Sequence, residues 1–294
     1  MGAVEGKIAV VTGAGRGIGR AEALALAAGG ATVVVNDVDA DQAAVVVAEI
    51  EGAGGTAVAH TDDVSTFAGA ESAVAAAVDG FGRLDVLVNN AGIIRDAMSF
   101  SMDEAAFDDV LRVHLKGHFG CAHFAGIHWR ERAKAGEEGV TGRIVNTASE
   151  SGLYGLAGQV NYAAAKAGIA SMTIALGREL KKYGVTVNAI APRARTRMTE
   201  TVLSGIGPTE GGFDEWDPAN IAPVVVWLAS DAAARINGQV FVVFADRVHL
   251  MTGWDLHGTI ANDGAAFTVD ELVARTDELF GDRRTGLPPM GFGS

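Results

Sequence analysis

The chain has little cysteine, little proline and no long apolar run, and each shortage excludes a class of protein. With a single cysteine, Cys121, it forms no internal disulfide, which suits a reducing compartment. Six prolines and no repeat exclude a collagen-like chain, although 39 of the 294 residues are glycine. No apolar stretch approaches the roughly 20 residues of a membrane-spanning helix, and the first residues lack a signal-peptide pattern. We therefore expect a soluble, cytoplasmic protein.

Positive charge is also scarce. The chain has 23 Lys and Arg residues against 36 Asp and Glu residues, which leaves a net charge of −13. Nucleic acids and anionic membranes would repel such a chain, so neither is expected as a partner. Apolar residues make up 49% of the sequence, which excludes a disordered chain. The composition thus indicates a folded protein whose many glycines serve local backbone roles.

Short β-branched runs alternate with longer Ala-rich segments of helical character. The predicted strands are residues 8–11, 32–35, 56–59, 84–88, 143–146, 185–190 and 239–243. The predicted helices are residues 17–28, 40–51, 67–78, 104–134, 162–180 and 269–280. Strands that are apolar nearly throughout are buried on both faces, and strand–helix repetition forms right-handed βαβ units. The sequence predicts an α/β fold, a single Rossmann-like, doubly wound parallel sheet with helices on both faces. This domain covers residues 1–245, and an extension follows over residues 246–294.

A glycine-rich turn joins the first predicted strand to the first helix. The spacing that fits a dinucleotide loop is Gly13, Gly17 and Gly19. Ile18 takes the last glycine position of the usual G-x-G-x-x-G pattern, which is therefore not met literally. Glycine lets the backbone turn sharply and approach a pyrophosphate, which then faces the helix N-terminus. The turn is a candidate dinucleotide loop, although a tight turn without a ligand has the same pattern.

The second predicted strand leads to Asp37, at about the position where a carboxylate accepts hydrogen bonds from the adenosine ribose hydroxyls. Asp37 would repel a 2′-phosphate there, as would the nearby Asp39 and Asp41. Arg16 favours the opposite choice, since its guanidinium is able to pair with that phosphate. Because the carboxylate would occupy the hydroxyl site itself, we expect NAD rather than NADP as the cofactor.

Tyr162 and Lys166 stand one helical turn apart, so both side chains lie on one face of the helix. A free phenol has a pKa of about 10, and a neighbouring ammonium lowers it. Such a phenol exchanges a proton with an alcohol or carbonyl oxygen, to which Ser149, after the 143–146 strand, is placed to donate a hydrogen bond. The segment 89–92 ends another strand, at the sheet edge where doubly wound folds bind ligands. By itself, the Tyr162 and Lys166 spacing also arises by chance in helices.

Taken together, these motifs resemble those of the short-chain dehydrogenase/reductase family over residues 5–245. The matching residues are Thr12, Gly13, Gly17, Gly19, Asp63, Val64, Asn89, Asn90, Ala91, Gly92, Ser149, Tyr162, Lys166, Pro192 and Thr196.

The resemblance implies a role for each part of the site. Tyr162 would be the general acid/base, Lys166 would lower its pKa and bind the nicotinamide ribose, and Ser149 would polarise the substrate oxygen. Asp63 and Val64 would flank the adenine. The full set of implied cofactor contacts is Gly13, Arg16, Gly17, Ile18, Gly19, Asp37, Asp63, Val64, Asn90, Ala91, Gly92, Tyr162, Lys166, Pro192 and Thr196, the last reaching the carboxamide.

His114 takes the place at which the family usually has an asparagine, whose backbone carbonyl holds a water on the lysine. A backbone role survives this change, whereas a catalytic role for the His114 side chain stays open beside simple packing. His118, His123 and His128 follow on the same predicted helix, but no carboxylate lies between the first two histidines in zinc-protease spacing. We therefore expect no metal.

Arg193 replaces the glycine that the family usually has at this point, and Arg195 and Arg197 follow it. These arginines would meet an anionic part of the substrate, such as the phosphates of an acyl-CoA, or they would pair with surface acids. Glu150, Tyr154, Arg193 and Arg195 are the candidate substrate residues.

The segments 113–117 and 191–199 resemble a narrower branch of the family. That branch holds the 3-hydroxyacyl-CoA dehydrogenase part of peroxisomal multifunctional enzymes and actinobacterial steroid-side-chain dehydrogenases. It implies an NAD-dependent oxidoreductase of a small-molecule secondary alcohol or ketone, a 3-hydroxyacyl-CoA or a hydroxysteroid, acting as a homotetramer or dimer. The alternatives are an NADP-linked ketoreductase of the 3-oxoacyl type and a catalytically silent dinucleotide-binding sensor or scaffold.

Overall fold

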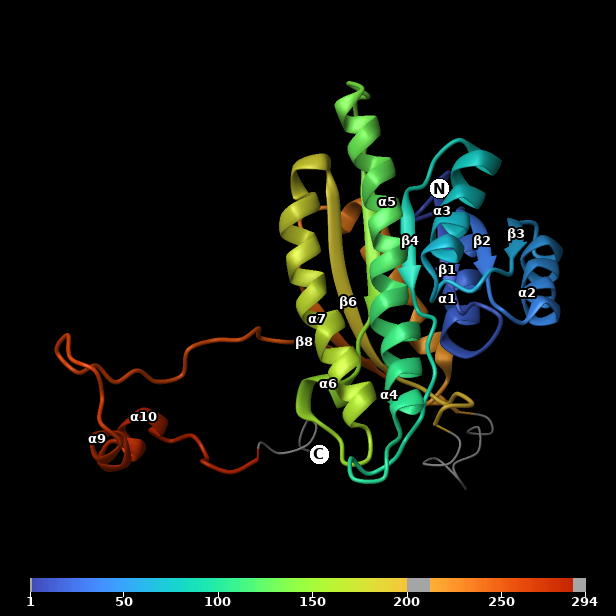
Figure 1. Cartoon of the computed structure of the whole chain (residues 1–294). Coiled ribbons are helices and arrows are strands. Elements are labelled where there is room, and N and C mark those ends of the chain that lie inside the picture. Colours follow the sequence, from blue (N-terminus) through green and yellow to red (C-terminus); the bar gives the residue numbers. More distant parts are fainter. Residues whose placement is uncertain (1, 200–211, 288–294) are drawn as a thin grey trace. The chain divides into compact units, whose positions relative to one another are not determined.

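A computed structural model describes residues 2–199 and 212–287 of the chain (Figure 1). The chain divides into two compact units, Met1–Leu250 and Met251–Ser294. The described residues of the first unit form eight strands: β1 (Ile8–Thr12), β2 (Thr32–Asn36), β3 (Thr56–His60), β4 (Val86–Asn89), β5 (Gly142–Thr147), β6 (Val185–Arg193), β7 (Val240–Phe244) and β8 (Arg247–Leu250).

These strands form one sheet in the order β3-β2-β1-β4-β5-β6-β7-β8. Strands β1 to β7 pair in parallel, and β8 pairs antiparallel with β7. The order reverses between β1 and β4, which puts a topological switch point beside the first strand. The predicted doubly wound α/β fold is confirmed.

Helices cover both faces of the sheet. They are α1 (Gly17–Ala28), α2 (Ala40–Gly52), α3 (Phe67–Phe81), α4 (Glu104–Leu111), α5 (Gly117–Lys134), α6 (Glu150–Tyr154), α7 (Val160–Leu180) and α8 (Ala222–Ala229). A π-helix, η1 (Arg112–Lys116), and three 3-10 turns, η2 (Lys181–Tyr183), η3 (Pro218–Asn220) and η4 (Asp231–Ala233), are also present among the described residues.

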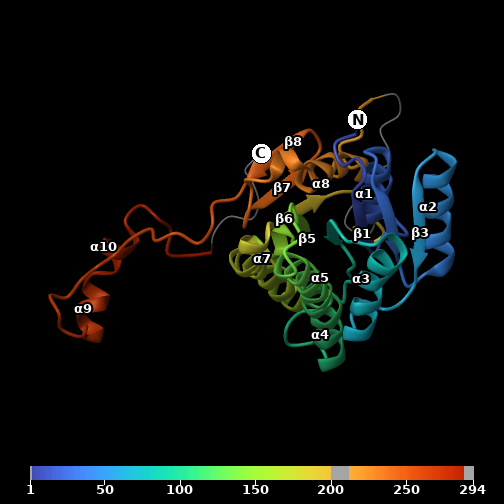
Figure 2. The ribbon, with the colours of Figure 1, turned by 90° about the horizontal axis from the view of Figure 1, so that it is seen from above.

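Two apolar clusters form the core, one on each face of the sheet. The first joins the sheet to α1, α2 and α8, and the second joins it to α3, α5 and α7. Val10 and Val11 of β1 belong to different clusters, because successive side chains of a strand point to opposite faces. Figure 2 shows α1 and α8 on one side of the sheet and α3, α5 and α7 on the other.

The segment predicted as one helix over residues 104–134 is helical throughout, but its winding changes in the middle. Helix α4 leads into the π-helix η1, and α5 follows directly. A turn of π-helix has wider winding than an α-helix and is frequent at functional sites. His114 lies inside this turn, so the altered winding decides where its side chain points.

Strand β8 continues the sheet beyond residue 245, where the sequence pattern ended the domain. It is an edge strand and mostly exposed, so no buried run or alternation marks it in the sequence. The second unit contains α9 (Val269–Ala274), which starts at a capping box between Thr268 and Glu271, and α10 (Thr276–Phe280). None of residues 251–287 is buried. Among the described residues, the helices are too short or too polar to cross a bilayer.

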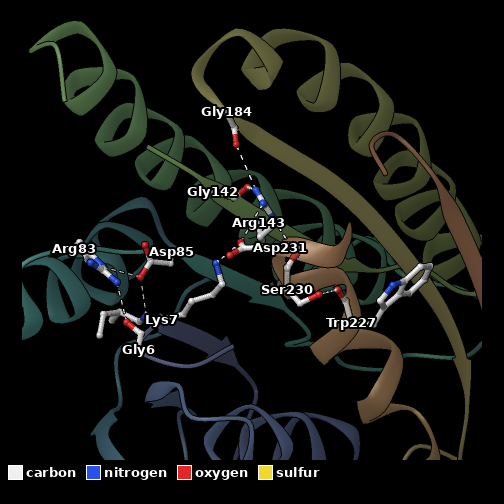
Figure 3. A network of polar contacts seen from close by, with 11 residues as sticks. Gly6, Lys7, Arg83, Asp85, Gly142, Arg143, Gly184, Trp227, Ser230 and Asp231 are labelled. Atoms are coloured by element: carbon white, nitrogen blue, oxygen red, sulfur yellow. Dashed lines mark hydrogen bonds and ion pairs between the residues drawn. The ribbon is translucent and has the colours of Figure 1, made fainter. Parts of the chain in front are cut away.

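Charged groups link the amino ends of the central strands (Figure 3). Asp85, just before β4, accepts hydrogen bonds from Ile8 N at 2.8 Å and from Arg83 Nε at 2.9 Å. The buried Arg143 of β5 lies 3.6 Å from Asp231 in η4. This edge is opposite to the carboxyl ends of the strands, so the network stabilises the sheet away from the candidate site.

Candidate active site

The glycine turn joins the carboxyl end of β1 to α1, beside the switch point of the sheet. Gly13 and Gly17 have φ of 63° and 56°, a backbone conformation that favours glycine. A Cβ on Gly13 would lie 2.8 Å from the Ala91 Cα, so the turn packs directly on the segment after β4. Asn90 fixes this contact, because its side-chain amide donates to the carbonyl oxygens of Thr12 and Gly13, both at 3.0 Å.

The first turn of α1 continues this packing. Ile18 is partly buried and packs on the first core cluster. A Cβ on Gly19 would overlap the Asn90 amide and the Gly13 carbonyl. Both positions therefore shape the turn through packing, whether or not a ligand touches them.

Asp37 follows β2 and faces the glycine turn. Its Oδ2 accepts a hydrogen bond from Gly15 N at 2.9 Å, and its Oδ1 accepts one from Asp39 N at 3.0 Å. Arg16 forms an ion pair with Asp39, with 2.8 Å between Nη2 and Oδ2. The carboxylate predicted to meet the ribose thus lies against the turn. The Arg16 guanidinium, which would favour the 2′-phosphate of NADP, is paired with the Asp39 carboxylate.

The residues expected beside the adenine lie in the turn after β3. Val64 is buried and Asp63 is exposed. The Asp63 carboxylate accepts a hydrogen bond from Ser65 N at 2.9 Å and pairs with Arg112 Nη1 at 3.3 Å. A Cβ on Gly117 would lie 3.3 Å from the Val64 carbonyl oxygen. The turn is therefore fastened to η1 and α5, at the same edge as the glycine turn.

Ser149 and Tyr162 meet although thirteen positions separate them in the chain. Ser149 caps α6, where its Oγ accepts a hydrogen bond from Ser151 N at 3.2 Å. Its hydroxyl also hydrogen-bonds the phenol of Tyr162, in the first turn of α7. Burial raises the pKa of Tyr162 above its usual value, and Asp96 raises it further, whereas the Ser149 hydrogen bond lowers it. The phenol is therefore protonated at neutral pH in this arrangement.

Asn161, next to Tyr162, was not singled out in the sequence. It is fully buried. Its amide donates to the carbonyl oxygens of Arg95 and Ala106, both at 3.0 Å, and its Oδ1 accepts from Tyr162 N at 2.7 Å. Asn161 therefore sets where α7 begins and how Tyr162 enters the site. The available signal was an amide side chain at a helix start, where such residues satisfy free backbone groups.

Lys166 lies one turn after Tyr162 and is buried. Its Nζ donates to the Thr147 carbonyl oxygen at 2.5 Å and lies 5.5 Å from the centre of the Tyr162 ring. Burial lowers the pKa of Lys166 to about 7. The ammonium was expected to lower the pKa of the phenol, yet here it bonds to a backbone carbonyl, and the pKa of Tyr162 is raised. The physical reason is that a buried ammonium needs an acceptor, and the end of β5 supplies one.

His114 is buried behind Tyr162, with the two rings edge to face and 5.1 Å between their centres. Its Nε2 lies 2.7 Å from the Ile93 carbonyl oxygen and 3.0 Å from Ile93 N. Burial lowers the pKa of His114 to about 3, so the ring is neutral. A Cβ on Gly92 would overlap the same ring. This geometry favours packing over proton transfer as the role of the His114 side chain.

A second buried layer of amides lies next to this histidine. Asn89 of β4 donates to Asn146 Oδ1 at 2.9 Å, and Asn146 Nδ2 donates to Thr173 Oγ1 of α7 at 3.0 Å. His118 of α5 is buried as well, and burial lowers its pKa well below the usual value. Within the described ranges, no three His, Cys, Asp or Glu side chains lie together as metal ligands would.

The four candidate substrate residues lie near the ends of β6 and α6. Arg193 forms a two-pronged ion pair with Glu150. Arg195 forms another with Asp214, at 2.7 and 3.0 Å. Tyr154, the last residue of α6, is partly exposed. The pairing of these arginines with acids is the alternative that was left open for them.

Pro192 and Thr196 lie on the other side of the glycine turn. Pro192 is partly exposed near the end of β6. A Cβ on Gly17 would lie 3.4 Å from Thr196 Cγ2, so the two residues face each other closely. Thr196 N donates to Thr199 Oγ1 at 2.8 Å, which orders the start of the loop after β6.

The model of the short chain dehydrogenase family matches residues 7–205 of this chain. The chain belongs to the short-chain dehydrogenase family. The family resemblance drawn from the sequence motifs is thereby confirmed. A short-chain dehydrogenase is an oxidoreductase that binds a nicotinamide dinucleotide.

Individual relatives support the same placement. Hydroxyacyl-CoA dehydrogenase ChsB1 of Mycobacterium tuberculosis is 48% identical over 287 residues, which cover 95% of this chain and 90% of that protein. Peroxisomal multifunctional enzyme type 2 of Mus musculus is 42% identical over 250 residues, 82% of this chain and 32% of that enzyme. The crystal structure of a short chain dehydrogenase from Mycobacterium avium has 45% identity and a TM-score of 0.88, and covers 99% of this chain and 100% of that one. The narrower branch drawn from the motifs is confirmed as well.

The residues of this short-chain dehydrogenase fit a dinucleotide. Gly13 and Gly17 of the turn, which lie against Asn90 and Thr196, carry no side chains, as close approach of a pyrophosphate to the backbone requires. The Asp37 carboxylate borders the same turn, through its hydrogen bond with Gly15 N. When bound, the nicotinamide supplies the acceptor or donor of a hydride.

Proposed function

We propose that this chain is an NAD-dependent dehydrogenase of 3-hydroxyacyl-CoA thioesters. The observation that carries the proposal is the hydrogen-bonded pair of Ser149 and Tyr162, with Lys166 one turn away, at the sheet edge that holds the glycine turn. The named activity of the Mycobacterium tuberculosis relative supports the substrate class. Hydroxysteroids are the second class of alcohol to be tested.

The proposed chemistry is proton transfer at one substrate oxygen. In oxidation, the ionised Tyr162 Oη takes the proton of the substrate hydroxyl, and the carbon that bears this hydroxyl gives its hydride to the acceptor that the nicotinamide supplies when bound. In reduction, the Tyr162 phenol gives its proton to the carbonyl oxygen, whose carbon receives the hydride. Ser149 Oγ donates a hydrogen bond to that oxygen and keeps it facing Tyr162. Lys166 Nζ lies 5.5 Å from the centre of the Tyr162 ring and favours the phenolate only while Lys166 is charged, that is, below its pKa of about 7. Since burial raises the pKa of Tyr162, the oxidation rate should rise with pH as the phenol loses its proton.

NAD is preferred in this proposal for two reasons. Asp37 offers a carboxylate where a 2′-phosphate would bring a second negative charge. Arg16, the cation that would favour the phosphate, is paired with Asp39. A phosphate at this guanidinium would have to compete with the Asp39 carboxylate.

Arg197 is our candidate for the phosphates of the CoA part. Arg193 and Arg195 already hold acids in two-pronged pairs. Arg197 is exposed and forms no ion pair with any described residue. The Arg197→Ala variant should raise KM for a CoA thioester more than KM for a hydroxysteroid.

A homo-oligomer, dimer or tetramer, is part of the proposal. Phe119 and Ile127 expose apolar surface on the long helix α5, where 41% and 36% of their areas are accessible. The oligomer mass from light scattering of the full chain tests this point.

The decisive experiment follows NADH absorbance with a series of 3-hydroxyacyl-CoA thioesters and hydroxysteroids, each with NAD and with NADP. We expect kcat/KM for a 3-hydroxyacyl-CoA with NAD to exceed that with NADP by about tenfold or more, or 1.4 kcal/mol. Comparable efficiency with NADP would contradict the Asp37 argument and favour the ketoreductase. The Tyr162→Phe variant should bind NADH but turn over nothing. NADH binding by the native chain without turnover of any substrate would indicate a sensor instead.

A further inference from the structure

One ion pair joins the end of β6 to the start of α6. Arg193 Nε and Nη2 each donate to a carboxylate oxygen of Glu150, with 2.6 Å between Nη2 and Oε1. Two parallel N–H···O bonds of this kind fix direction as well as distance. The residues are 43 positions apart, and both were candidate substrate residues, with pairing to an acid left open for Arg193; the structure makes each the partner of the other.

The surroundings of the Arg193–Glu150 ion pair make its loss costly for the stability of this region. The exposed fractions of the two side chains are 32% for Arg193 and 17% for Glu150. The guanidinium also lies over the Phe244 ring of β7, 5.5 Å from its centre. Removing the guanidinium would leave a mostly buried carboxylate without its cation, which costs far more than losing an exposed pair.

The pair acts next to a residue of the candidate site. Glu150 directly follows Ser149, whose hydroxyl contacts both Ser151 N, at 3.2 Å, and the Tyr162 phenol. On another side, α6 lies against the backbone of α7, since a Cβ on Gly152 would be 2.5 Å from Ala167 N. Helix α6 has only five residues, and it lies between the α7 backbone on one side and the Arg193 side chain on the other.

We propose that Arg193 is a positioning residue, which acts through Glu150 to hold the Ser149 hydroxyl at Tyr162. This inference rests on the proposed function, because only proton transfer at the substrate oxygen requires Ser149 Oγ in one place. A misplacement of about 1 Å at a reacting group lowers a rate by about a hundredfold. Loss of positioning therefore lowers kcat, whereas loss of a direct substrate contact would raise KM.

The test is a double-mutant cycle of Arg193→Met and Glu150→Gln in the full chain. Arg193→Met should lower kcat for a 3-hydroxyacyl-CoA by about ten- to a hundredfold and change KM by less than about threefold. The double variant should regain at least about threefold of that kcat, because no buried carboxylate is left unpaired. Arg193→Lys, which keeps the charge but loses the fork, should lie between Arg193→Met and the native chain.

The matched control is Arg83→Met. It removes the 2.9 Å ion pair with Asp85 at the opposite edge of the sheet (Figure 3), so kcat should stay within about twofold of the native value. Thermal melting of every variant separates loss of fold from loss of rate. If Arg193→Met does not fold, Arg193→Lys and Glu150→Gln carry the same comparison.

A second readout does not need activity. Amide hydrogen exchange of the peptide over residues 148–156 should speed up in Arg193→Met by about tenfold, and the peptide over residues 40–52 should not change. A higher KM with unchanged kcat would overturn the proposal in favour of a substrate contact. Unchanged kcat and exchange would overturn it outright. If the native chain oxidises no substrate, the proposed function fails, and the exchange comparison still decides whether Arg193 holds α6.

Discussion

Replacing Glu22 by glutamine should remove a pH-dependent loss of stability. Glu22 lies on the buried face of α1 and is fully inaccessible to solvent. Neither carboxyl oxygen has a hydrogen-bond partner among the described residues. Burial therefore favours the neutral acid and raises the pKa of Glu22 from 4.5 to about 8. A carboxyl with such a pKa has to stay protonated, or be charged at high cost, in the folded chain.

The direction and size of the effect follow from this difference. Between pH 4.5 and about 8, the folded chain holds a proton that the unfolded chain has released, so stability falls as pH rises through this window. The full difference corresponds to about 5 kcal/mol, at about 1.4 kcal/mol for each pKa unit. Below pH 4.5 both states are protonated and Glu22 makes no pH-dependent contribution. Glutamine has the same shape and does not titrate, so its variant lacks this slope.

Urea denaturation at about pH 5, 6.5 and 8 measures the effect. At each pH, the quantity to compare is the free energy of unfolding of Glu22→Gln minus that of the native chain. This difference should be larger at the highest pH than at the lowest, by several kcal/mol. Glu51→Gln, on the exposed end of α2, is the control and should keep the native pH dependence. Parallel curves for Glu22→Gln and the native chain would show that Glu22 is ionised in the fold at neutral pH, and the reasoning would be wrong.

Three further substitutions test close packing around the site and the core. Gly92→Ala would drive a Cβ into the His114 ring and should lower the stability of the fold by about 1–3 kcal/mol, as measured by thermal melting. Adding His114→Ala should recover part of this stability. An unchanged Tm of Gly92→Ala would refute the close approach of Gly92 to the His114 ring. His114→Asn should keep substantial activity because the neutral ring packs, and a loss of more than about a hundredfold in kcat, near 2.7 kcal/mol of barrier, would contradict this. Trp129→Phe loses the 2.6 Å hydrogen bond from Nε1 to the Leu84 carbonyl oxygen and should cost about 1–3 kcal/mol in urea denaturation. Trp254→Phe, at a position 94% exposed, should cost nothing, and equal losses in the two tryptophan variants would refute the buried hydrogen bond.

Local patterns in the chain were sufficient for the parallel strands and for most of the helices between them. The runs at Thr32–Asn36 and Val86–Asn89 are apolar nearly throughout, as strands covered on both faces must be. Positions 13 and 17 have a positive φ, which glycine adopts easily and other residues avoid, so the two glycines mark the turn in the sequence. Features of this kind depend on near neighbours in the chain, which is why they could be predicted.

Partners that lie far apart in the chain could not be predicted in this way. Arg193 has Glu150, Asp214 and other acids within reach in principle, and only the approach of β6 to α6 selects Glu150. Likewise, nothing near Lys166 in sequence indicates that its ammonium bonds to the Thr147 carbonyl oxygen. The turn of π-helix around His114 also leaves no local signature in the sequence.

The sequence by itself therefore determined the alternation of parallel strands and helices, the glycine turn and the family. Only the tertiary structure decided how these residues are charged and paired. It buried Glu22, raised the pKa of Tyr162 and lowered that of Lys166, since burial depends on which surfaces meet. The physical reason is the distance along the chain over which each kind of interaction acts. Backbone preferences act between neighbours along the chain, whereas desolvation and ion pairing act between groups that folding brings together.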